Sequence, residues 1–420
     1  PFFQSPQDDY GYDVSDHIEV DTIFGSLDDF DRMLSAAHAI GLKIIIDQVY
    51  SHTSDRHAWF EESRQSTDNS KADWYVSADA KTDGSPPNNW LSVFGGPAWT
   101  WDARRRQYYL HNYLSTQPDL NLHNPSVQNA LLDVARFWLE RGIDGMRLDA
   151  INYGMHDEAL CDNPAAECDS DRPARPWLMQ VKRYNTNHRQ MPVFLERLRK
   201  LTNEYDDIMT VAEVGGADSV PVMHAYTSGN ARLSTAYSID FLNLSNPTAT
   251  SLRASLAEWP NAMTEGWPSW AFSNHDAKRV VTRWAIGSDQ QHRARLFGLL
   301  LVALRGNVFI YQGEELGLPQ ADVPFEALRD PEAIAHWPHS LGRDGARTPM
   351  PWQNKSTNAG FSDAEPWLPV DAAHLQLSVD GQETHPDSTL NFFRSLLSLR
   401  RSSRALRTGD LEIIAAPRNI

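Results

Sequence analysis

Three carboxylates in this chain each end a separate apolar run of sequence. Asp149 closes GIDGMRLD, Glu213 closes DIMTVAE and Asp276 closes WAFSNHD. A barrel of alternating strands and helices brings such ionisable groups together, because its active site is built at the carboxyl-terminal ends of the strands. The pattern therefore predicts an enzyme whose chemistry uses carboxyl groups.

Strand-like runs and helical segments alternate along the chain and must position these residues. Helical periodicity is found in segments such as 130–141 and 192–204. An open six-stranded parallel sheet would leave unpaired edges, which folded proteins avoid. We therefore expect an eight-stranded barrel, with two of its strands lying upstream of residue 1. The six apolar runs are Lys43–Val49, Ile143–Leu148, Ile208–Ala212, Ala236–Phe241, Ser269–Phe272 and Val308–Tyr311.

The composition is that of a globular protein with a large core. The chain has 420 residues, of which 41% are hydrophobic and 10% aromatic, which suits one barrel with an inserted subdomain. Its formal net charge of −17 opposes binding to nucleic acid or to an anionic membrane. Its apolar stretches fall short of the ~20 residues that a membrane span requires. We expect a soluble protein with a neutral small-molecule substrate, no nucleic-acid partner and no membrane partner.

Compartment and cysteine pairing stay open at this stage. The chain begins with Pro1 and not with Met, so the lack of a signal peptide says little, and cytoplasmic and periplasmic locations both remain. Cys161 and Cys168 are the only cysteines and lie in a loop rich in Pro, Asp and Ala. They either close a small disulfide or remain two thiols.

Seven motifs carry a resemblance to a known family. Five of them occur in the order seen in the α-amylase superfamily, glycoside hydrolase family 13. Two more, GYDVSDH (11–17) and GRDGARTPMPW (342–352), are similar to those of its α-glucosidase and oligo-1,6-glucosidase branch. The resemblance implies an α/β fold, a (β/α)8 TIM barrel. The five motifs are DQVYSH (47–52), QPDLN (117–121), GMRLD (145–149), AEVGG (212–216) and SNHD (273–276).

The resemblance also implies a domain organisation. Residues 1–52 and 117–405 would form the barrel, lacking its first strand and most of its second, because Pro1–Phe3 resembles the end of strand two. Residues 53–116 would form the inserted B domain, and 406–420 would begin a C-terminal β-sandwich. A further insertion from Glu314 to about Asp387 precedes the last barrel helix, which the pattern of Leu390, Phe393, Leu396, Leu397 and Arg400 predicts.

The resemblance assigns the catalytic pair to Asp149 and Glu213. Arg147 and Asp149 are two apart on a strand and so share a face, where the guanidinium keeps Asp149 ionised as a nucleophile must be. A structural ion pair is the alternative. Glycosidases need a second carboxyl group that is protonated, and Glu213 is the candidate because a nearby anion favours its neutral form.

Asp276 is the third carboxylate that the family uses. The resemblance implies that it bonds the 2- and 3-hydroxyls of the sugar while its charge offsets that of the oxocarbenium-like transition state. His275 and His52 resemble the histidines that hold the same glucose unit. Ser51 replaces the Asn that relatives usually carry, which weakens any calcium prediction and leaves catalysis untouched.

Four further residues are expected around the substrate, and a fifth is expected to support Arg147. Asp9 and Arg343 match the pair that closes the pocket around the terminal 4-hydroxyl in α-glucosidases. Tyr12 matches the aromatic platform, and Phe94 either forms a second wall or is a core residue. Asp47 is expected to be a structural partner of Arg147 and not a catalyst.

The predicted function is retaining, exo-acting hydrolysis of terminal α-1,4-linked glucose, with transglucosylation when an acceptor displaces water. Ala150 favours α-1,4 over α-1,6 linkages, since relatives that cleave the latter carry Val there. Sucrose hydrolases or isomerases, oligo-1,6-glucosidases and a non-catalytic binding relative are the alternatives. No cofactor is required, although a structural calcium or magnesium ion is expected in an amino-terminal loop outside this chain. The substrate would be a small glucoside or oligosaccharide, and the protein a monomer or homodimer.

Overall fold

Two compact units, Pro1–Ala236 and Tyr237–Ile420, make up the chain, and each has its own parallel strand pairs. The computed structural model describes residues 1–167, 176–215, 219–238, 242, 244, 247–257, 267–284, 289–340 and 342–412.

A parallel sheet lies at the centre of the first unit. It contains β3 (Ile45–Val49), β7 (Gly145–Asp149) and β8 (Met209–Val214), and it confirms three of the predicted strands. Parallel strands are usually covered on both faces, and buried apolar residues such as Ile46, Met146 and Val211 alternate here with polar and charged ones. A side chain at Gly145 would place its Cβ 2.2 Å from the carbonyl oxygen of Met209, so only glycine permits this strand spacing.

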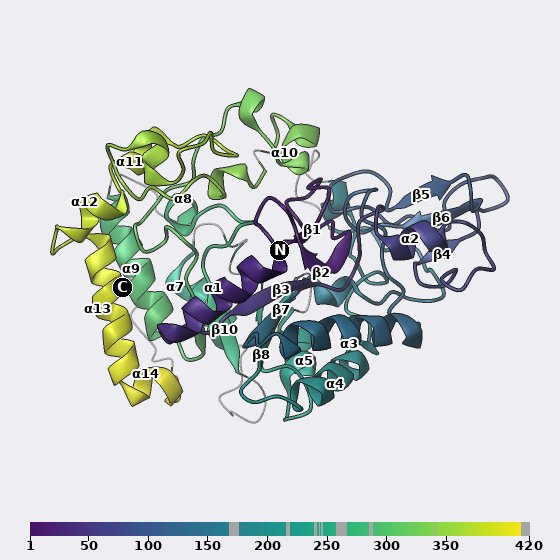
Figure 1. Ribbon diagram of the computed structural model, residues 1–420, viewed down its shortest axis with the longest axis horizontal. Helices are drawn as coiled ribbons and strands as arrows, with labels where there is room; N and C mark the ends of the chain where they lie inside the picture. Colours follow the sequence, from purple (N-terminus) through teal and green to yellow (C-terminus); the bar gives the residue numbers. More distant parts are fainter. Residues whose placement is uncertain are drawn as a thin grey trace. The chain divides into compact units, whose positions relative to one another are not determined.

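Helices with one apolar face cover this sheet. Figure 1 shows α3 (Pro125–Glu140) beside α4 (Met191–Thr202), as the helical periodicity of the two segments predicts. The side chain of Asn124 accepts from the backbone of Ser126 and so caps the start of α3. The unit also contains α1 (Leu27–Ala39), α5 (Ser219–Thr227) and the 3-10 turns η1 (Ile151–Tyr153) and η2 (Pro176–Met179).

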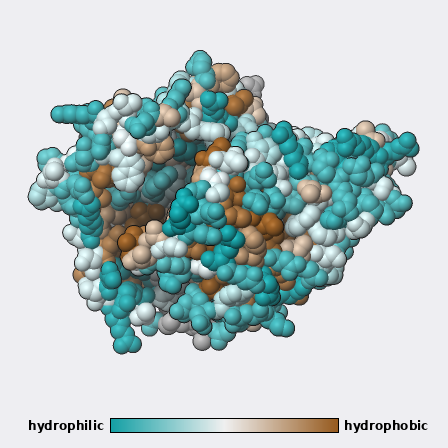
Figure 2. Space-filling view, in the orientation of Figure 1, coloured by the Kyte–Doolittle hydropathy of each residue, from teal (hydrophilic) through white to brown (hydrophobic). Residues whose placement is uncertain are grey.

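The segment between β3 and α3 forms a small antiparallel sheet of its own. After α2 (Ala58–Ser63), its strands lie in the order β4 (Ser77–Ala78), β6 (Gln107–Leu110) and β5 (Trp99–Asp102). Trp90 and Trp99 lie in its small core. Its surface is largely hydrophilic on the face that Figure 2 shows, in line with its polar composition. The expected boundaries of the B domain, 53 and 116, stay a prediction.

Two other predicted strands have different outcomes. At the start of the chain, β1 (Phe3–Gln4) pairs antiparallel with β2 (Asp16–Val20) in a separate two-stranded sheet. This pairing does not test the likeness of Pro1–Phe3 to the end of strand two, which stays a prediction. β9 (Thr235–Ser238) covers the start of the predicted strand Ala236–Phe241, and residues 239–241 lie outside the described residues.

The second unit repeats the parallel arrangement. β10 (Pro268–Ala271) and β11 (Asn307–Phe309) pair in parallel and confirm the last two predicted strands. In Figure 1, α9 (Gln290–Ala303) lies beside α13 (Thr389–Ser402), the predicted last barrel helix. A Cβ at Gly298 would lie 2.4 Å from the ring of Phe393, so this glycine allows the two helices to approach closely. α7 (Ala249–Ala257) and α8 (Val280–Trp284) precede α9 along the chain.

The predicted insertion from Glu314 to Asp387 contains short helices around small apolar clusters. After it, α14 (Arg404–Thr408) begins at Ser403, whose side chain caps its amino terminus. Residues 406–408 are therefore helical, residues 413–420 lie outside the described residues, and the β-sandwich expected in 406–420 stays a prediction. The short helices are η4 (Phe325–Ala327), α10 (Pro331–His336), η5 (Asp344–Ala346), η6 (Thr357–Gly360), α11 (Ala372–Leu375) and α12 (Val379–Glu383).

Candidate active site

The register of the first unit's sheet brings the candidate catalytic residues to one edge. Asp47 on β3 lies opposite Arg147 on β7, and Asp149 is the last residue of β7. On β8, Ala212 lies opposite Leu148, and Glu213 follows it near the end of the strand. The carboxyl-terminal ends of these parallel strands therefore carry the acidic residues, as the sequence predicts.

One guanidinium joins the acidic residues into a cluster. Arg147 Nη1 lies 2.7 Å from Asp149 Oδ1 and 2.7 Å from Asp47 Oδ2, while its Nη2 lies 2.6 Å from Glu213 Oε2. The side chains of Asp149 and Glu213 are only 11% and 8% exposed, so these pairs are shielded from water. Two nitrogens of one guanidinium hold the two carboxyl groups. The distance between the carboxyl groups is therefore limited to the width of the guanidinium plus two hydrogen bonds.

Tyr12 completes what we call the Arg147 cluster, which consists of Tyr12, Asp47, Arg147, Asp149 and Glu213. The Tyr12 hydroxyl donates to Asp47 Oδ2 at 2.8 Å, and the Arg147 guanidinium lies 5.9 Å from the centre of the Tyr12 ring. Asp47 thus supports Arg147 directly, which confirms its expected structural role.

His52 is fully buried next to this cluster. Its Nδ1 lies 2.9 Å from the hydroxyl of Ser51, and its Nε2 lies 3.1 Å from the carbonyl oxygen of Tyr12. Burial lowers the pKa of His52 to about 3, so the ring is neutral. A neutral imidazole has one donor and one acceptor nitrogen, so Nε2 donates to Tyr12 and Nδ1 accepts from Ser51. The carbonyl oxygen of Tyr12, which can only accept, therefore fixes the tautomer, and the hydroxyl of Ser51, which replaces the usual Asn, donates to the remaining nitrogen.

Asp9 lies in a tight loop of the first unit, close to His52. The buried Asp13 carboxylate shapes this loop by accepting from the backbone of Asp8 at 2.9 Å and of Asp9 at 3.1 Å. Gln117, the first residue of the QPDLN motif, donates to Asp9 Oδ2 at 3.1 Å and also lies 3.2 Å from His52 Nε2. Asp9 is therefore held beside His52 by a residue of another predicted motif.

Ala150 and Phe94 also lie around the catalytic pair. Ala150 adopts a left-handed backbone conformation, φ 40° and ψ 34°, and its N–H donates to Glu213 Oε2 at 3.3 Å. Phe94 is buried with its ring centre 6.0 Å from that of Tyr113, which lies 5.1 Å from the His52 ring. Phe94 thus belongs to an aromatic group that reaches His52, although whether it contacts substrate stays a prediction.

The second unit holds the remaining predicted residues in the Asp276 cluster, which consists of His275, Asp276, Asp330, Arg343 and Arg347. After β10, the Asn274 side chain accepts from the backbone N–H of Asp276 at 2.9 Å and turns the chain sharply. Arg347 Nη2 lies 2.7 Å from Asp276 Oδ1, and Arg343 Nη1 lies 3.4 Å from the same oxygen. The Asp276 side chain is 33% exposed, so it remains accessible to a ligand.

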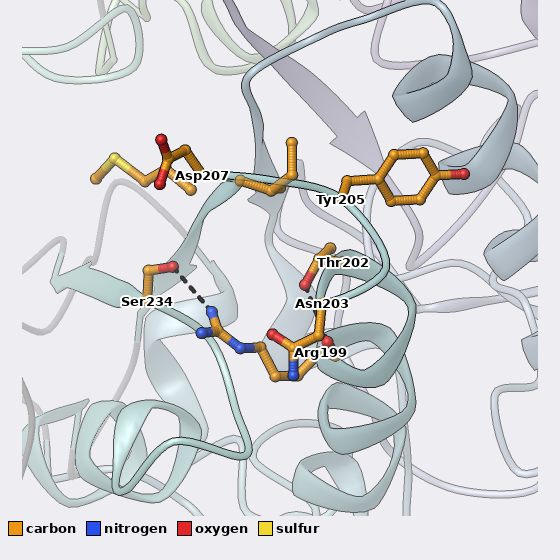
Figure 3. A pocket seen from close by; sticks show the side chains of 8 residues that line it. Arg199, Thr202, Asn203, Tyr205, Asp207 and Ser234 are labelled. Carbon is orange, nitrogen blue, oxygen red and sulfur yellow. Dashed lines mark hydrogen bonds between the residues drawn. The ribbon is translucent and has the colours of Figure 1, made fainter.

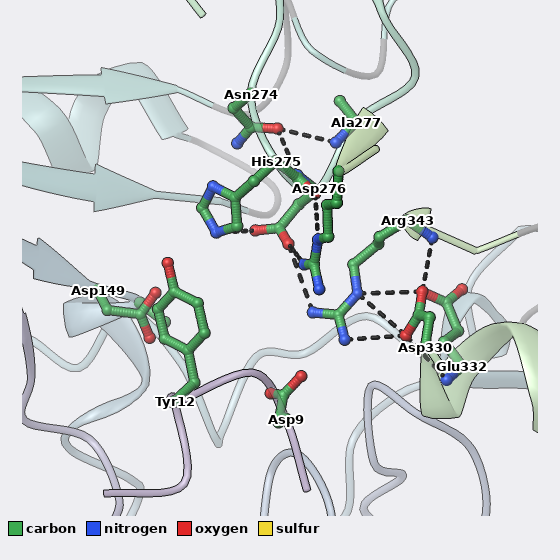
Figure 4. A network of polar contacts seen from close by, with 12 residues as sticks. Asp9, Tyr12, Asp149, Asn274, His275, Asp276, Ala277, Asp330, Glu332 and Arg343 are labelled. Atoms are coloured by element: carbon green, nitrogen blue, oxygen red, sulfur yellow. Dashed lines mark hydrogen bonds and ion pairs between the residues drawn. The ribbon is translucent and has the colours of Figure 1, made fainter. Parts of the chain in front are cut away.

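A buried aspartate anchors Arg343 from behind. Figure 4 shows Arg343 between Asp276 and Asp330, with dashed lines to both. Asp330 is completely buried, and its Oδ1 lies 2.9 Å from Arg343 Nη2. Desolvation by burial would raise the pKa of Asp330, but the charge and hydrogen bonds of Arg343, together with the charge of Arg347, hold that pKa below its usual value. Asp330 therefore fixes the guanidinium that contacts Asp276.

The structure thus brings the predicted residues together in two groups. Asp149 and Glu213 meet in the Arg147 cluster, while His275, Asp276 and Arg343 meet in the Asp276 cluster. Asp9 belongs to the first unit and Arg343 to the second, so their pairing stays a prediction. Cys161 is exposed and Cys168 lies outside the described residues, so the disulfide also stays open.

Sequence reasoning missed three residues of these groups. Asp330 precedes a proline at the start of α10, where an aspartate is usually only a helix cap. Arg347 lies four residues after Arg343 within the same motif, and its position there could have marked it as a site residue. Gln117 opens the QPDLN motif but carries no charge, so nothing marked it as a partner of Asp9.

A separate cavity of about 380 Å³ lies at the opposite end of β8. It is lined by Ile208 and Met209 at the start of the strand, and Figure 3 shows Arg199 reaching Ser234 there, with Nη1 3.4 Å from Oγ. Asp207 is its only carboxylate. A glycosidase needs two facing carboxyl groups, so this cavity does not compete with the Arg147 cluster as a catalytic site.

Comparison with known proteins gives concordant results. The family described as alpha amylase, catalytic domain, matches residues 1–409. A probable alpha-glucosidase from Rhizobium meliloti (strain 1021) is 50% identical over 99% of this chain and 76% of its own length. An oligo-1,6-glucosidase from Heyndrickxia coagulans is 36% identical over 99% of this chain and 79% of its own.

A solved structure is equally similar. The crystal structure of an alpha-glucosyl transfer enzyme superposes with a TM-score of 0.94 at 49% identity, covering 97% of this chain and 77% of that one. Among the described residues, every helix is too short or too polar to cross a membrane.

Proposed function

The chain belongs to the alpha-amylase catalytic-domain family, and we propose that it is a retaining, exo-acting α-glucosidase of that family. Its fold is the (β/α)8 barrel of its structural neighbours, with active-site residues at the carboxyl-terminal ends of the strands. The observation that carries the proposal is the Arg147 guanidinium that holds Asp149 and Glu213 together. Retaining glycosidases need closely spaced carboxyl groups, about 5–5.5 Å apart, because no water has to fit between nucleophile and sugar.

The contacts divide the roles between the two carboxyl groups. Asp149 Oδ1 accepts from the Arg147 guanidinium, which favours the ionised carboxylate, so we assign the attack on the anomeric carbon to Asp149. Glu213 Oε2 pairs with Arg147 and accepts from the N–H of Ala150, and we assign the proton for the leaving oxygen to Glu213. Attack by Asp149 and protonation by Glu213 release the aglycone and leave a glucosyl ester. Glu213 then takes a proton from water, or from an acceptor hydroxyl, that displaces Asp149.

The Asp276 cluster supplies the remaining contacts in this proposal. The exposed part of Asp276 would bond the 2- and 3-hydroxyls, with His275 at its side, and its charge would offset the charge that develops on the sugar ring. Arg343 would close the pocket together with Asp9 around the terminal 4-hydroxyl, while Tyr12 and His52 contact the same glucose. A blind pocket of this kind restricts cleavage to the end of a chain.

We propose α-1,4-linked glucose as the preferred substrate because Ala150 directly follows the nucleophile and is small. The second candidate is α-1,6 cleavage, which the name of the 36% identical oligo-1,6-glucosidase suggests. Transfer to an acceptor is the third, because the solved neighbour at 49% identity is a glucosyl transfer enzyme. Both use the same covalent intermediate, so they differ only on the acceptor side.

Product analysis tests this proposal. The enzyme is incubated with maltotetraose, maltose, isomaltose and sucrose, and proton NMR follows the first sugar released. We expect glucose from maltotetraose, in the α-anomeric form, and faster cleavage of maltose than of isomaltose. Maltose as the first product would contradict exo action, and β-glucose would contradict retention.

A further inference from the structure

An aromatic row leads away from the catalytic pair within the first unit. The Tyr113 ring lies 5.1 Å from that of His52, and the Tyr153 ring lies 5.4 Å from that of Tyr113. Tyr153 is at the end of η1, which begins directly after Ala150. Burial raises the pKa of Tyr153, and the charges of Asp119 and Glu213 add to this effect, which places the ring within electrostatic range of the catalytic acid.

A lysine ammonium lies between the end of this row and a tryptophan. Lys182 Nζ is 5.3 Å from the centre of the Tyr153 ring and 5.5 Å from that of Trp177. Its one hydrogen bond to the described residues goes to the carbonyl oxygen of Leu91 at 3.3 Å, and none of their carboxylates lies within 4.0 Å of it. Burial lowers the pKa of Lys182 to about 7, against the opposing influence of Asp119. The side chain is nevertheless half-buried and not closed off from solvent.

The indole of Trp177 adds a second donor. Its Nε1 is buried, and it has no acceptor among the described residues. An indole nitrogen only donates, and a buried donor without a partner costs about 1–3 kcal/mol. The faces of the Tyr153 and Trp177 rings partly compensate the charge of the Lys182 ammonium, but they do not replace an anionic oxygen as its partner. Among the residues that the structure describes, the Trp177 N–H thus has no acceptor, and the Lys182 amino group has only the carbonyl oxygen of Leu91.

We propose that Lys182 and Trp177 form a subsite that recognises an anionic group, carboxylate or phosphate, on the aglycone or acceptor. This inference rests on the proposed function, because it assigns these residues to the sugar-leaving side of the same site. An anionic oxygen bound there would accept from the Lys182 ammonium and from the indole N–H of Trp177. Tyr153 would line the path between this group and the bond that Glu213 protonates.

The test compares phenyl, 4-carboxyphenyl and 4-phosphophenyl α-glucosides as substrates. In Lys182→Gln, we expect kcat/KM for an anionic glucoside to fall roughly tenfold or more relative to phenyl glucoside, as for the loss of a charge-assisted hydrogen bond. Lys182→Arg should retain most of the preference. Lys200→Gln, which changes an exposed lysine on α4, should leave all three rates unchanged. A response in only the carboxylate arm or only the phosphate arm identifies which anion is recognised.

Trp177→Phe gives an independent measurement if Lys182→Gln does not fold, because it removes the N–H and keeps a ring. It should lower the anionic preference severalfold. Equal losses on all three glucosides in these variants, or no loss on either anionic one, would overturn the inference while leaving the proposed function intact. If the wild-type enzyme cleaves no α-glucoside, the proposed function fails instead. Fluorescence titration of wild type and Lys182→Gln with 4-hydroxybenzoate then still decides whether the anion site exists.

Discussion

In the Arg147 cluster one guanidinium bridges several carboxylates, whereas in the Asp276 cluster two guanidiniums converge on one. The side chains of Asp149 and Glu213 are 11% and 8% exposed, but that of Asp276 is 33% exposed. Shielding strengthens the electrostatic coupling between Asp149 and Glu213, the two groups that we propose make and break bonds. The carboxylate of Asp276 is more exposed, so its oxygens remain accessible to the hydroxyl groups of a ligand.

The comparison separates two ways of fixing a charged group. In the first cluster the partners are supplied by adjacent strands, so the sheet register itself sets the geometry. In the second, loop residues are fixed by Asp330, which lies completely buried behind Arg343. Changes to the first cluster should therefore affect chemistry most, and changes behind the second should affect stability first.

Replacing the nucleophile should have the largest effect. Asp149→Asn removes the attacking charge and nearly preserves the shape of the side chain, so hydrolysis and transfer should both fall by about 10⁴-fold or more. The same loss is expected on maltose and on activated aryl glucosides. Steady-state kinetics on both substrates checks this, and substantial residual transfer would contradict the covalent route.

Replacing the acid should have a smaller effect that depends on the leaving group. Glu213→Gln retains an acceptor for Arg147 and for the Ala150 N–H, but it carries no transferable proton. Cleavage of maltose should fall by roughly 10²–10⁴-fold, and release of an activated phenol should be much less affected. Rates for a series of aryl glucosides measure this difference. A uniform loss across the series would show that Glu213 is not the proton donor.

Removing the buried anchor of the Asp276 cluster tests the second half of the comparison. Asp330→Asn keeps a side chain that can cap α10 but leaves the Arg343 charge without its buried partner. Breaking such a pair costs about 3–5 kcal/mol. Denaturant unfolding should show this loss, whereas Asp371→Asn, at the start of α11, serves as a matched cap control with a change of about 1 kcal/mol or less. Equal losses in the two variants would remove the special role of Asp330.

A substitution next to the nucleophile should have the smallest effect. Ala150→Val should raise the ratio of isomaltose to maltose cleavage, by an amount that corresponds to about 1–3 kcal/mol. Because Ala150 has φ 40°, a β-branched residue is also strained there and should lower stability. Ala150→Ser, which is not branched, provides the control. An unchanged ratio in Ala150→Val would place the linkage preference elsewhere.

The sequence predicted the strands and the pairing of Arg147 with Asp149 because both depend on local pattern. Apolar runs that end in a charged residue mark barrel strands, and Arg147 two positions before Asp149 must share its face. The partner of Arg343 was not predictable in this way. Asp330 carries the local signature of a helix cap, and its second role appears only when the chain folds back on it.

Two other features were not predicted. The left-handed backbone of Ala150 had no glycine or asparagine to indicate it, and in the folded chain the N–H of Ala150 donates to Glu213. The helix α14 occupies part of the segment expected to be β-structure, since Ser403 supplies a helix cap that the resemblance did not consider. Family likeness thus supplied the candidate site residues, while local capping decided where this helix begins.

Trapping the covalent intermediate tests the central claim most directly. The wild-type enzyme is treated with a fluorinated glucosyl fluoride, which forms the glucosyl ester faster than it is hydrolysed, and the labelled peptide is sequenced by mass spectrometry. The account predicts one glucosyl label, carried by Asp149, and no label in Asp149→Asn. A label on Glu213, on Asp276 or on any other residue would contradict the assignment of Asp149 as the nucleophile.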